Sequence, residues 1–122
     1  MTSALLIFLI LLEIKHLLCD FIFQTLHQVQ NKGTYGHPGG LIHAGIHGLG
    51  TAIVLLLTGF YWWPILLVAV VESLIHYHLD WSKENLLRHW TWDKNKLFWS
   101  MLGMDQMLHQ LTYLGIAAVL FM

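Results

Sequence analysis

The sequence contains four pairs of polar side chains with one common spacing and with groups that bind metals. The pairs are His16 and Asp20, His43 and His47, His76 and Asp80, and Asp105 and His109. In an α-helix, residues four apart lie on one face, about 6 Å apart along the axis. Imidazole and carboxylate are both ligands of divalent ions such as Zn, Fe and Mn. The pairs therefore indicate a metal site, provided that each lies on a helix and the helices face one another.

Four segments are long and apolar enough to be such helices, and to cross a membrane. Hydrophobic residues make up 57% and charged residues 11% of the 122 residues, whereas an average soluble domain has about 25% charged residues. A helix needs about 20 mostly apolar residues to cross a bilayer. The predicted spans cover residues 3–24, 41–60, 64–81 and 105–122. We therefore predict one all-α domain over residues 1–122, an integral membrane four-helix bundle.

The positions of the cations predict how this bundle lies in the membrane. Five of the six Lys and Arg residues lie between spans one and two or between spans three and four. Positive charge favours the cytoplasmic side, so both termini are predicted on the outer, periplasmic side of the inner membrane. The segment 82–103 is too apolar for a simple linker. Ser82 and Asp93 are expected to cap two short amphipathic helices on the inner surface, between the third and fourth spans.

The same topology places the four pairs at one depth. Spans one and three run towards the cytoplasm and spans two and four run away from it. The pairs lie late in spans one and three and early in spans two and four. Ionisable groups inside a membrane are costly and mark functional sites. We therefore predict that all eight paired residues are ligands of one or two divalent metal ions.

Other polar residues are candidates for catalysis. Glu13 and Glu72 are predicted general bases, and Lys83 is predicted to hold an anionic group of a substrate. Two other interpretations of the pairs stay open, namely a metal-free polar or proton-relay network, and haem held by histidines of different helices. The formal net charge of −1 leaves no basic surface for nucleic acid.

Several short motifs resemble those of a family of small bacterial and phage membrane proteins, known as domain of unknown function 3307. The motifs are His16-Leu-Leu-Cys-Asp20-Phe-Ile-Phe-Gln24, Lys32, His43-x-x-x-His47, His76-x-x-x-Asp80-x-x-Lys83 and Asp105-Gln106-x-x-His109. The resemblance covers nearly the whole chain. More distantly, the pattern is similar to membrane-bound metal-dependent hydrolases that carry intramembrane His and Asp pairs. That likeness implies a hydrolase, whereas the family itself implies no assigned activity.

The leading hypothesis is a membrane-embedded, metal-dependent hydrolase. Its substrate would be amphipathic, such as a lipid or isoprenoid phosphate or ester, because the pairs lie at headgroup depth near the cytoplasmic face. One alternative is a di-iron oxidoreductase of the membrane, which only the His43-x-x-x-His47 pair fits. Another is a non-enzymatic accessory subunit of a membrane complex that binds metal or haem. Membrane lipid is the expected partner in each case, and a homo-oligomer stays open.

Overall fold

The protein is helical through most of the part that the structure describes, residues 2–91 and 93–122. In this computed structural model the elements are α1 (Thr2–Leu17), the π-helical turn η1 (Leu18–Ile22), α2 (Leu26–Asn31), α3 (Pro38–Leu57), α4 (Trp62–His89) and α5 (Lys94–Phe121). The described residues contain no strand. The all-α prediction is therefore confirmed.

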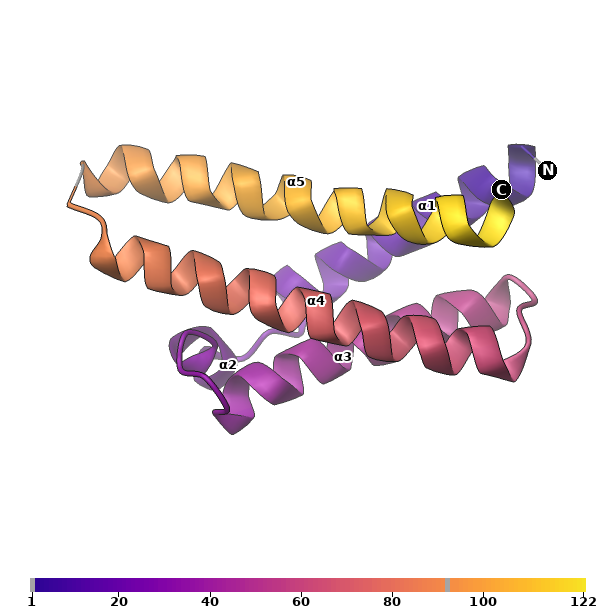
Figure 1. Cartoon of the computed structure of the whole chain (residues 1–122), viewed down its shortest axis with the longest axis horizontal. Coiled ribbons are helices and arrows are strands. Elements are labelled where there is room, and N and C mark those ends of the chain that lie inside the picture. The colour runs from indigo at the N-terminus through magenta and orange to yellow at the C-terminus, as the bar shows by residue number, and fades with distance from the viewer. Residues whose placement is uncertain (1, 92) are drawn as a thin grey trace.

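The four long helices run up and down beside one another (Figure 1). α3 and α4 form one antiparallel hairpin, α4 and α5 form another, and α1 packs against both α3 and α5. The two termini lie at one end of the bundle, and α2 packs against α3 towards the other end (Figure 1). The late residues of α1 and α4 therefore lie at the same end as the early residues of α3 and α5.

Local signals explain where the helices begin and end. The Thr25 hydroxyl accepts a hydrogen bond from the Gln28 backbone N–H, and the Gln28 side chain accepts one from the Thr25 N–H, which is a capping box at the start of α2. His37 caps α3, with Pro38 at the first helical position, where a proline costs no hydrogen bond. After α3, Gly59 adopts a φ of 85°, which turns the chain towards α4.

The prediction of two short amphipathic helices between the third and fourth spans is wrong. Ser82 lies inside α4, which continues to His89. No glycine or proline lies between residues 65 and 89, so nothing interrupts the backbone hydrogen bonds of that helix. Asp93 does cap a helix, because its side chain accepts from the Asn95 N–H, but that helix is α5 itself. The segment 82–103 therefore lengthens α4 and α5 and forms no separate elements.

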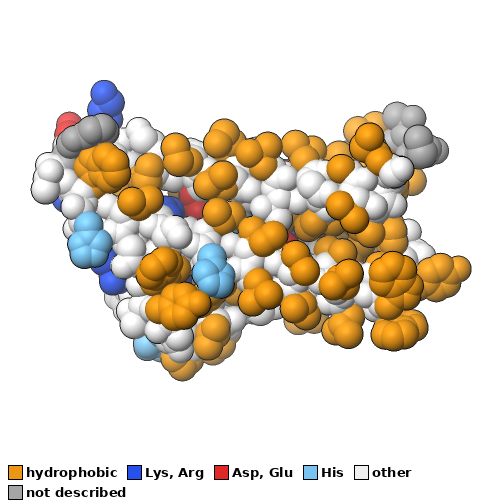
Figure 2. Space-filling model, viewed as in Figure 1, with side chains coloured by type: hydrophobic (Ala, Val, Ile, Leu, Met, Phe, Trp, Pro, Cys, Tyr) orange, Lys and Arg blue, Asp and Glu red, His pale blue; other side chains and the backbone are white. Residues whose placement is uncertain are grey.

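Apolar side chains cover much of the outer surface of the bundle, and polar side chains share that surface at the end opposite the termini, as Figure 2 shows for one face. Two helices, α3 and α4, are long and apolar enough to cross a membrane by length and composition. Exposed large hydrophobic residues lie on all four long helices, and they include Ile10, Ile14, Leu49, Ile53, Leu67, Val70, Leu111 and Leu114. The ionisable side chains of the four pairs, together with Lys15, Lys32 and Glu72, are buried instead. This distribution is the reverse of what a water-soluble domain requires.

The interior at the end with the two termini is apolar. Its buried cluster consists of Phe8, Leu12, Val54, Leu55, Tyr113 and Ala117, contributed by α1, α3 and α5. The Phe8 ring lies 5.3 Å from that of Phe121 and 6.1 Å from that of Phe60, measured between ring centroids. Further along the same helices, towards the other end, the interior becomes polar.

Candidate metal centre

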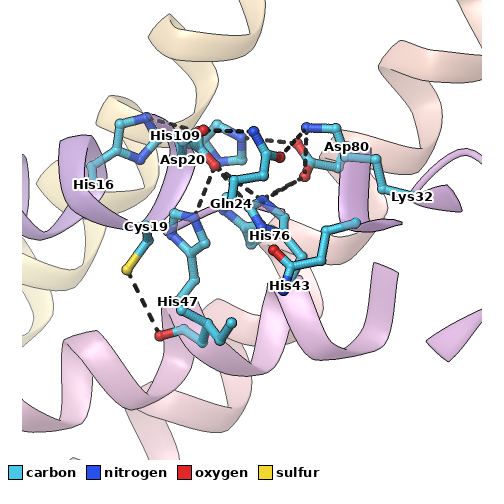
Figure 3. A network of polar contacts seen from close by, with 12 residues as sticks. His16, Cys19, Asp20, Gln24, Lys32, His43, His47, His76, Asp80 and His109 are labelled. Carbon is cyan, nitrogen blue, oxygen red and sulfur yellow. Dashed lines mark hydrogen bonds and ion pairs between the residues drawn. The ribbon is translucent and has the colours of Figure 1, made fainter. Parts of the chain in front are cut away.

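Each long helix turns its pair of polar residues into the bundle. The structure buries all eight predicted ligands, which are at most 5% exposed. They come from α1 with η1, from α3, from α4 and from α5. Figure 3 shows the imidazoles of His43, His47 and His76 gathered near the Asp20 carboxylate, with Asp80 beside them. The spacing that put each pair on one helix face thus places all four pairs at one level of the bundle.

Four of these residues form a first group, which we call the four-ligand group. It consists of Asp20, His43, His47 and His76, whose potential ligand atoms all lie within 4.8 Å of one another. Asp20 Oδ1 is 3.0 Å from His43 Nε2, 2.9 Å from His47 Nε2 and 3.7 Å from His76 Nε2. Ligand atoms about 2.0–2.1 Å from a tetrahedral ion lie roughly 3.3 Å apart. The group therefore has the dimensions of a single tetrahedral site.

A second group, the three-ligand group, consists of His76, Asp80 and His109. Asp80 Oδ2 is 3.3 Å from His76 Nε2, and Asp80 Oδ1 is 3.5 Å from His109 Nε2. On its other side, His109 Nε2 lies 3.2 Å from Asp105 Oδ1. The two groups share His76 Nε2, and one imidazole nitrogen binds one ion at a time. A single ion thus has two alternative positions, and a second ion requires Asp105 or water to complete its ligands.

Polar atoms without hydrogen bonds support the fit to a cation. Among the described residues, both Asp80 carboxylate oxygens, Asp105 Oδ1 and His109 Nε2 are buried and have no hydrogen-bond partner. Leaving such a group unsatisfied costs about 1–3 kcal/mol. These atoms face one another at ion-pair distances, so one cation between them would satisfy several at once.

The π-helical turn η1 carries Asp20 into the first group. The Phe23 backbone N–H donates to the Leu18 carbonyl over 2.7 Å, five residues back, so this turn is wider than an α-helical one. The Gln24 side-chain amide donates to the Asp20 carbonyl over 2.6 Å. π-turns recur at functional sites. Here the turn ends α1 and fixes the backbone beneath the Asp20 carboxylate.

His16 is placed beside the two groups, not within them. Its Nδ1 lies 2.8 Å from the Tyr113 hydroxyl, and its Nε2 lies 2.8 Å from Gln106 Oε1. The same Nε2 is 3.2 Å from Asp20 Oδ2. Both nitrogens of His16 thus have protein partners, and Asp20 keeps its other oxygen for the four-ligand group. The arrangement makes His16 a support for Asp20.

Three lysines reach the interior, each against a carboxylate. The pairs are Lys15 with Glu72, Lys32 with Asp80 and Lys83 with Asp105, with Nζ–oxygen distances of 2.7, 3.5 and 3.1 Å. Asp20 is a fourth buried carboxylate and lies among histidines. With neutral imidazoles, these side chains carry one excess negative charge. Because an uncompensated buried charge is costly, this excess favours added positive charge, as a metal cation or as a proton on one imidazole.

The three predicted catalytic residues lie in different surroundings. Lys83 is in the ion pair with Asp105. Glu72 is buried, where Lys15 donates to one of its oxygens and the Thr51 hydroxyl donates to the other over 2.8 Å. Glu13 is exposed on α1 and belongs to neither group.

Two side chains at the centre were missing from the predicted set. Tyr113 lies four residues after His109, so continuing the polar stripe of α5 would have identified it. Lys32, which also contacts Gln24 over 3.0 Å, follows the short helix α2. Only the family motifs included Lys32. No helical spacing predicts its position, because tertiary packing brings the segment after α1 back to the centre.

A comparison with models of protein families identifies the family of the chain. A family model described as "Protein of unknown function (DUF3307)" matches residues 7–122. The chain belongs to the DUF3307 family. The match confirms the resemblance found in the sequence, and it includes every residue of both ligand groups in this DUF3307 protein. No curated protein and no solved structure matches it.

Proposed function

We propose that the chain is a membrane-embedded, metal-dependent hydrolase. The observation that carries this proposal is the three-ligand group of His76, Asp80 and His109, with its unsatisfied polar atoms. Catalytic zinc sites hold the ion with three protein ligands and keep one position open, whereas structural sites are closed by four. The chemistry that a divalent ion supplies in such a site is activation of water and polarisation of a phosphoryl or acyl oxygen.

Lys83 and Asp105 are the groups best placed to assist next to the three-ligand group. The Lys83 side chain is 13% exposed, the most of the three interior lysines, so it can hold an anionic group at the edge of the centre. Asp105 Oδ1 has no hydrogen-bond partner among the described residues and lies beside His109. We assign it the general base, because Glu72 is already engaged by Lys15 and Thr51.

We place all four long helices across the inner membrane, with the polar end towards the cytoplasm and both termini on the periplasmic side. The apolar outer surface supports this placement for α1 and α5 as well as for α3 and α4. The cations that follow α1 and end α4 lie at the polar end, and positive charge favours the cytoplasmic side. The centre then lies at the depth of lipid headgroups.

A cavity at this end suits an amphipathic substrate such as a lipid or isoprenoid phosphate or ester. It has a volume of about 450 Å³, lies between the end of α4 and the start of α5, and is lined by Trp90, Leu97 and Met101 among others. Met101 precedes Asp105 by one helical turn on α5, so the cavity begins about one turn from the Lys83–Asp105 pair. In Figure 2, acidic and basic side chains are visible between α4 and α5 in this half of the molecule.

The proposal is tested with the purified protein in detergent. Elemental analysis identifies the resident ion, and the protein is then stripped with a chelator and reloaded with Zn, Mn or Fe. Alkyl phosphates and carboxylic esters are the substrates. We expect turnover that depends on the added metal and is lost in Asp20→Ala and Asp80→Ala.

The matched control is His78→Ala, which removes an exposed imidazole of α4 that lines neither ligand group nor this cavity. Turnover should be unchanged in this variant. Absence of turnover with every metal, or full turnover in Asp80→Ala, would contradict the hydrolase.

The four-ligand group favours a second candidate, a metal-stabilised accessory subunit without enzymatic activity. Asp20, His43, His47 and His76 supply as many protein ligands as a closed structural zinc site has. The visible spectrum of the protein with Co²⁺ in place of the resident ion distinguishes the accessory subunit from the hydrolase. A visible spectrum that added phosphate leaves unchanged, together with no turnover, supports the subunit. A spectrum that phosphate changes indicates an open position and supports the hydrolase.

A further inference from the structure

A second buried polar cluster separates the metal centre from the apolar end of the bundle. It consists of Lys15, Thr51, Glu72 and Tyr113, one side chain from each of the four long helices, and we call it the lysine–glutamate layer. The four residues are at most 5% exposed. Burying an ion pair costs several kcal/mol per ion before the attraction is counted. Such a layer needs a reason beyond packing.

The contacts hold Glu72 in one orientation. Lys15 Nζ donates to Glu72 Oε1 over 2.7 Å and also lies 3.3 Å from the Tyr113 hydroxyl. The Thr51 hydroxyl donates to Glu72 Oε2 over 2.8 Å. The lysine stem lies in a space that Gly50 leaves open, because a Cβ at position 50 would come within 2.8 Å of Lys15 Cγ. Side chains on two other helices, α1 and α3, thus fix the carboxylate, and Tyr113 of α5 contacts Lys15.

Two atoms of this layer face His47 of the four-ligand group. Glu72 Oε1 is 4.0 Å from His47 Nδ1, and Lys15 Nζ is 3.4 Å from the same nitrogen. The other nitrogen, His47 Nε2, lies 2.9 Å from Asp20 Oδ1. An imidazole that binds an ion through Nε2 carries its proton on Nδ1. Glu72 is the carboxylate of this layer that can accept that N–H once the 4.0 Å separation shortens to hydrogen-bond length. As the side chains stand, Lys15 lies closer and can donate to Nδ1 when that nitrogen carries no proton.

We propose that Glu72 is a positioning residue that orients His47 for metal binding by accepting its Nδ1–H, and that Lys15 and Thr51 hold Glu72 in place. Histidines that bind metals generally donate their second nitrogen to such a partner, and removing the partner weakens metal binding about 10–100-fold. Lys15 cancels the charge of Glu72, so the layer adds no net charge beside the centre. This inference rests on the proposed metal centre, and it explains why a lysine lies in the interior.

The test measures the Co²⁺ affinity and visible spectrum of the whole chain in detergent. Glu72→Gln retains the shape of the side chain and removes its charge. A second variant, Lys15→Met with Glu72→Leu, removes both charges and so leaves no unpaired ion in the interior. The controls are Glu13→Gln, on an exposed glutamate of α1, and Thr58→Val, on a threonine of the α3 end whose hydroxyl bonds only backbone carbonyls.

We expect Glu72→Gln and the double variant to bind Co²⁺ about 10–100-fold more weakly than wild type, with an altered spectrum. The double variant should retain the melting temperature of the metal-free protein to within a few degrees. A purely structural layer would instead lower that temperature and leave the spectrum of bound Co²⁺ unchanged.

Wild-type affinity and an unchanged spectrum in both variants would overturn the role of Glu72 and leave the metal centre standing. A wild-type protein that binds no Co²⁺ would overturn the metal centre, and this role with it.

Discussion

The two ends of the bundle are built from the same four helices but have opposite interiors. At the end with the termini, the interior consists of side chains such as Phe8, Leu12 and Leu55. At the other end it contains histidines, aspartates and lysines. The polar interior is nonetheless buried, since its eight paired residues are at most 5% exposed. Exposure therefore does not account for the polar end, and because buried ionisable groups are costly in such a setting, we attribute that end to function.

The change from one interior to the other takes about one turn on α1, α3 and α5. On α1, Leu12 is followed by Lys15, and on α3, Val54 is preceded by Thr51. On α5, the Tyr113 ring belongs to the apolar cluster while its hydroxyl contacts His16. Substitutions at distant, independent sites have additive effects. The comparison therefore predicts that substitutions at the polar end affect metal binding, whereas substitutions at the apolar end affect stability.

The largest expected effect is at His76, which belongs to both ligand groups. His76→Ala should lower metal affinity more than 100-fold, about 2.7 kcal/mol or more, because neither group is complete without it. Metal content after gel filtration and Co²⁺ titration measure the loss. The control His78→Ala changes an exposed histidine two residues away. Full metal content in His76→Ala would show that the polar end is not a metal centre built around this residue.

A smaller effect, on stability alone, is expected from Leu55→Ala at the apolar end. Leu55 is 0% exposed, and its neighbour Leu56 is 66% exposed and provides the control Leu56→Ala. Replacing a buried leucine costs 2–5 kcal/mol in soluble proteins, and in lipid only the packing part is lost, so we expect about 2 kcal/mol. Denaturant unfolding in detergent measures the change. A lower metal content in Leu55→Ala would break the separation between the two ends.

The common level of the polar pairs could be predicted from sequence, whereas details of their surroundings could not. An i, i+4 spacing fixes the face of a helix locally, and alternating helix directions then set a common level. The π-turn at Leu18–Ile22 has no such signal, because an α-helix satisfies the same apolar pattern. The partners of His16 also depend on another helix, since Tyr113 and Gln106 both come from α5.

The end of α4 also could not be predicted from the sequence pattern. The third span was predicted to end at residue 81, with Ser82 as the cap of a new helix, but a serine can also lie inside a helix, as Ser82 does. With no glycine or proline to interrupt it, the helix continues to His89.

Tyr113→Phe sharpens the comparison at the boundary between the two ends. The change retains the ring in the apolar cluster and removes the hydroxyl that contacts His16 Nδ1 over 2.8 Å and Lys15 Nζ over 3.3 Å. Interhelical hydrogen bonds in membrane proteins contribute about 0.6 kcal/mol on average and about 1.7 at most. We expect a loss of about 1 kcal/mol in unfolding free energy, and less than tenfold in metal affinity. Tyr61→Phe, on an exposed tyrosine, is the control.

In this variant both quantities should change slightly, because the residue belongs to both ends. A change in stability with metal affinity identical to wild type would assign Tyr113 to the apolar end alone.

The smallest effect is expected from Glu13→Gln, which tests whether function is confined to the interior. Glu13 is exposed on α1, next to the exposed Ile14. An exposed substitution away from special features changes stability by no more than about 0.5 kcal/mol, and metal content and turnover should match wild type. If turnover falls while the metal content is retained, Glu13 acts as the general base. The active site would then extend to the outer surface of α1, and the polar interior would hold the metal ion but not every catalytic group.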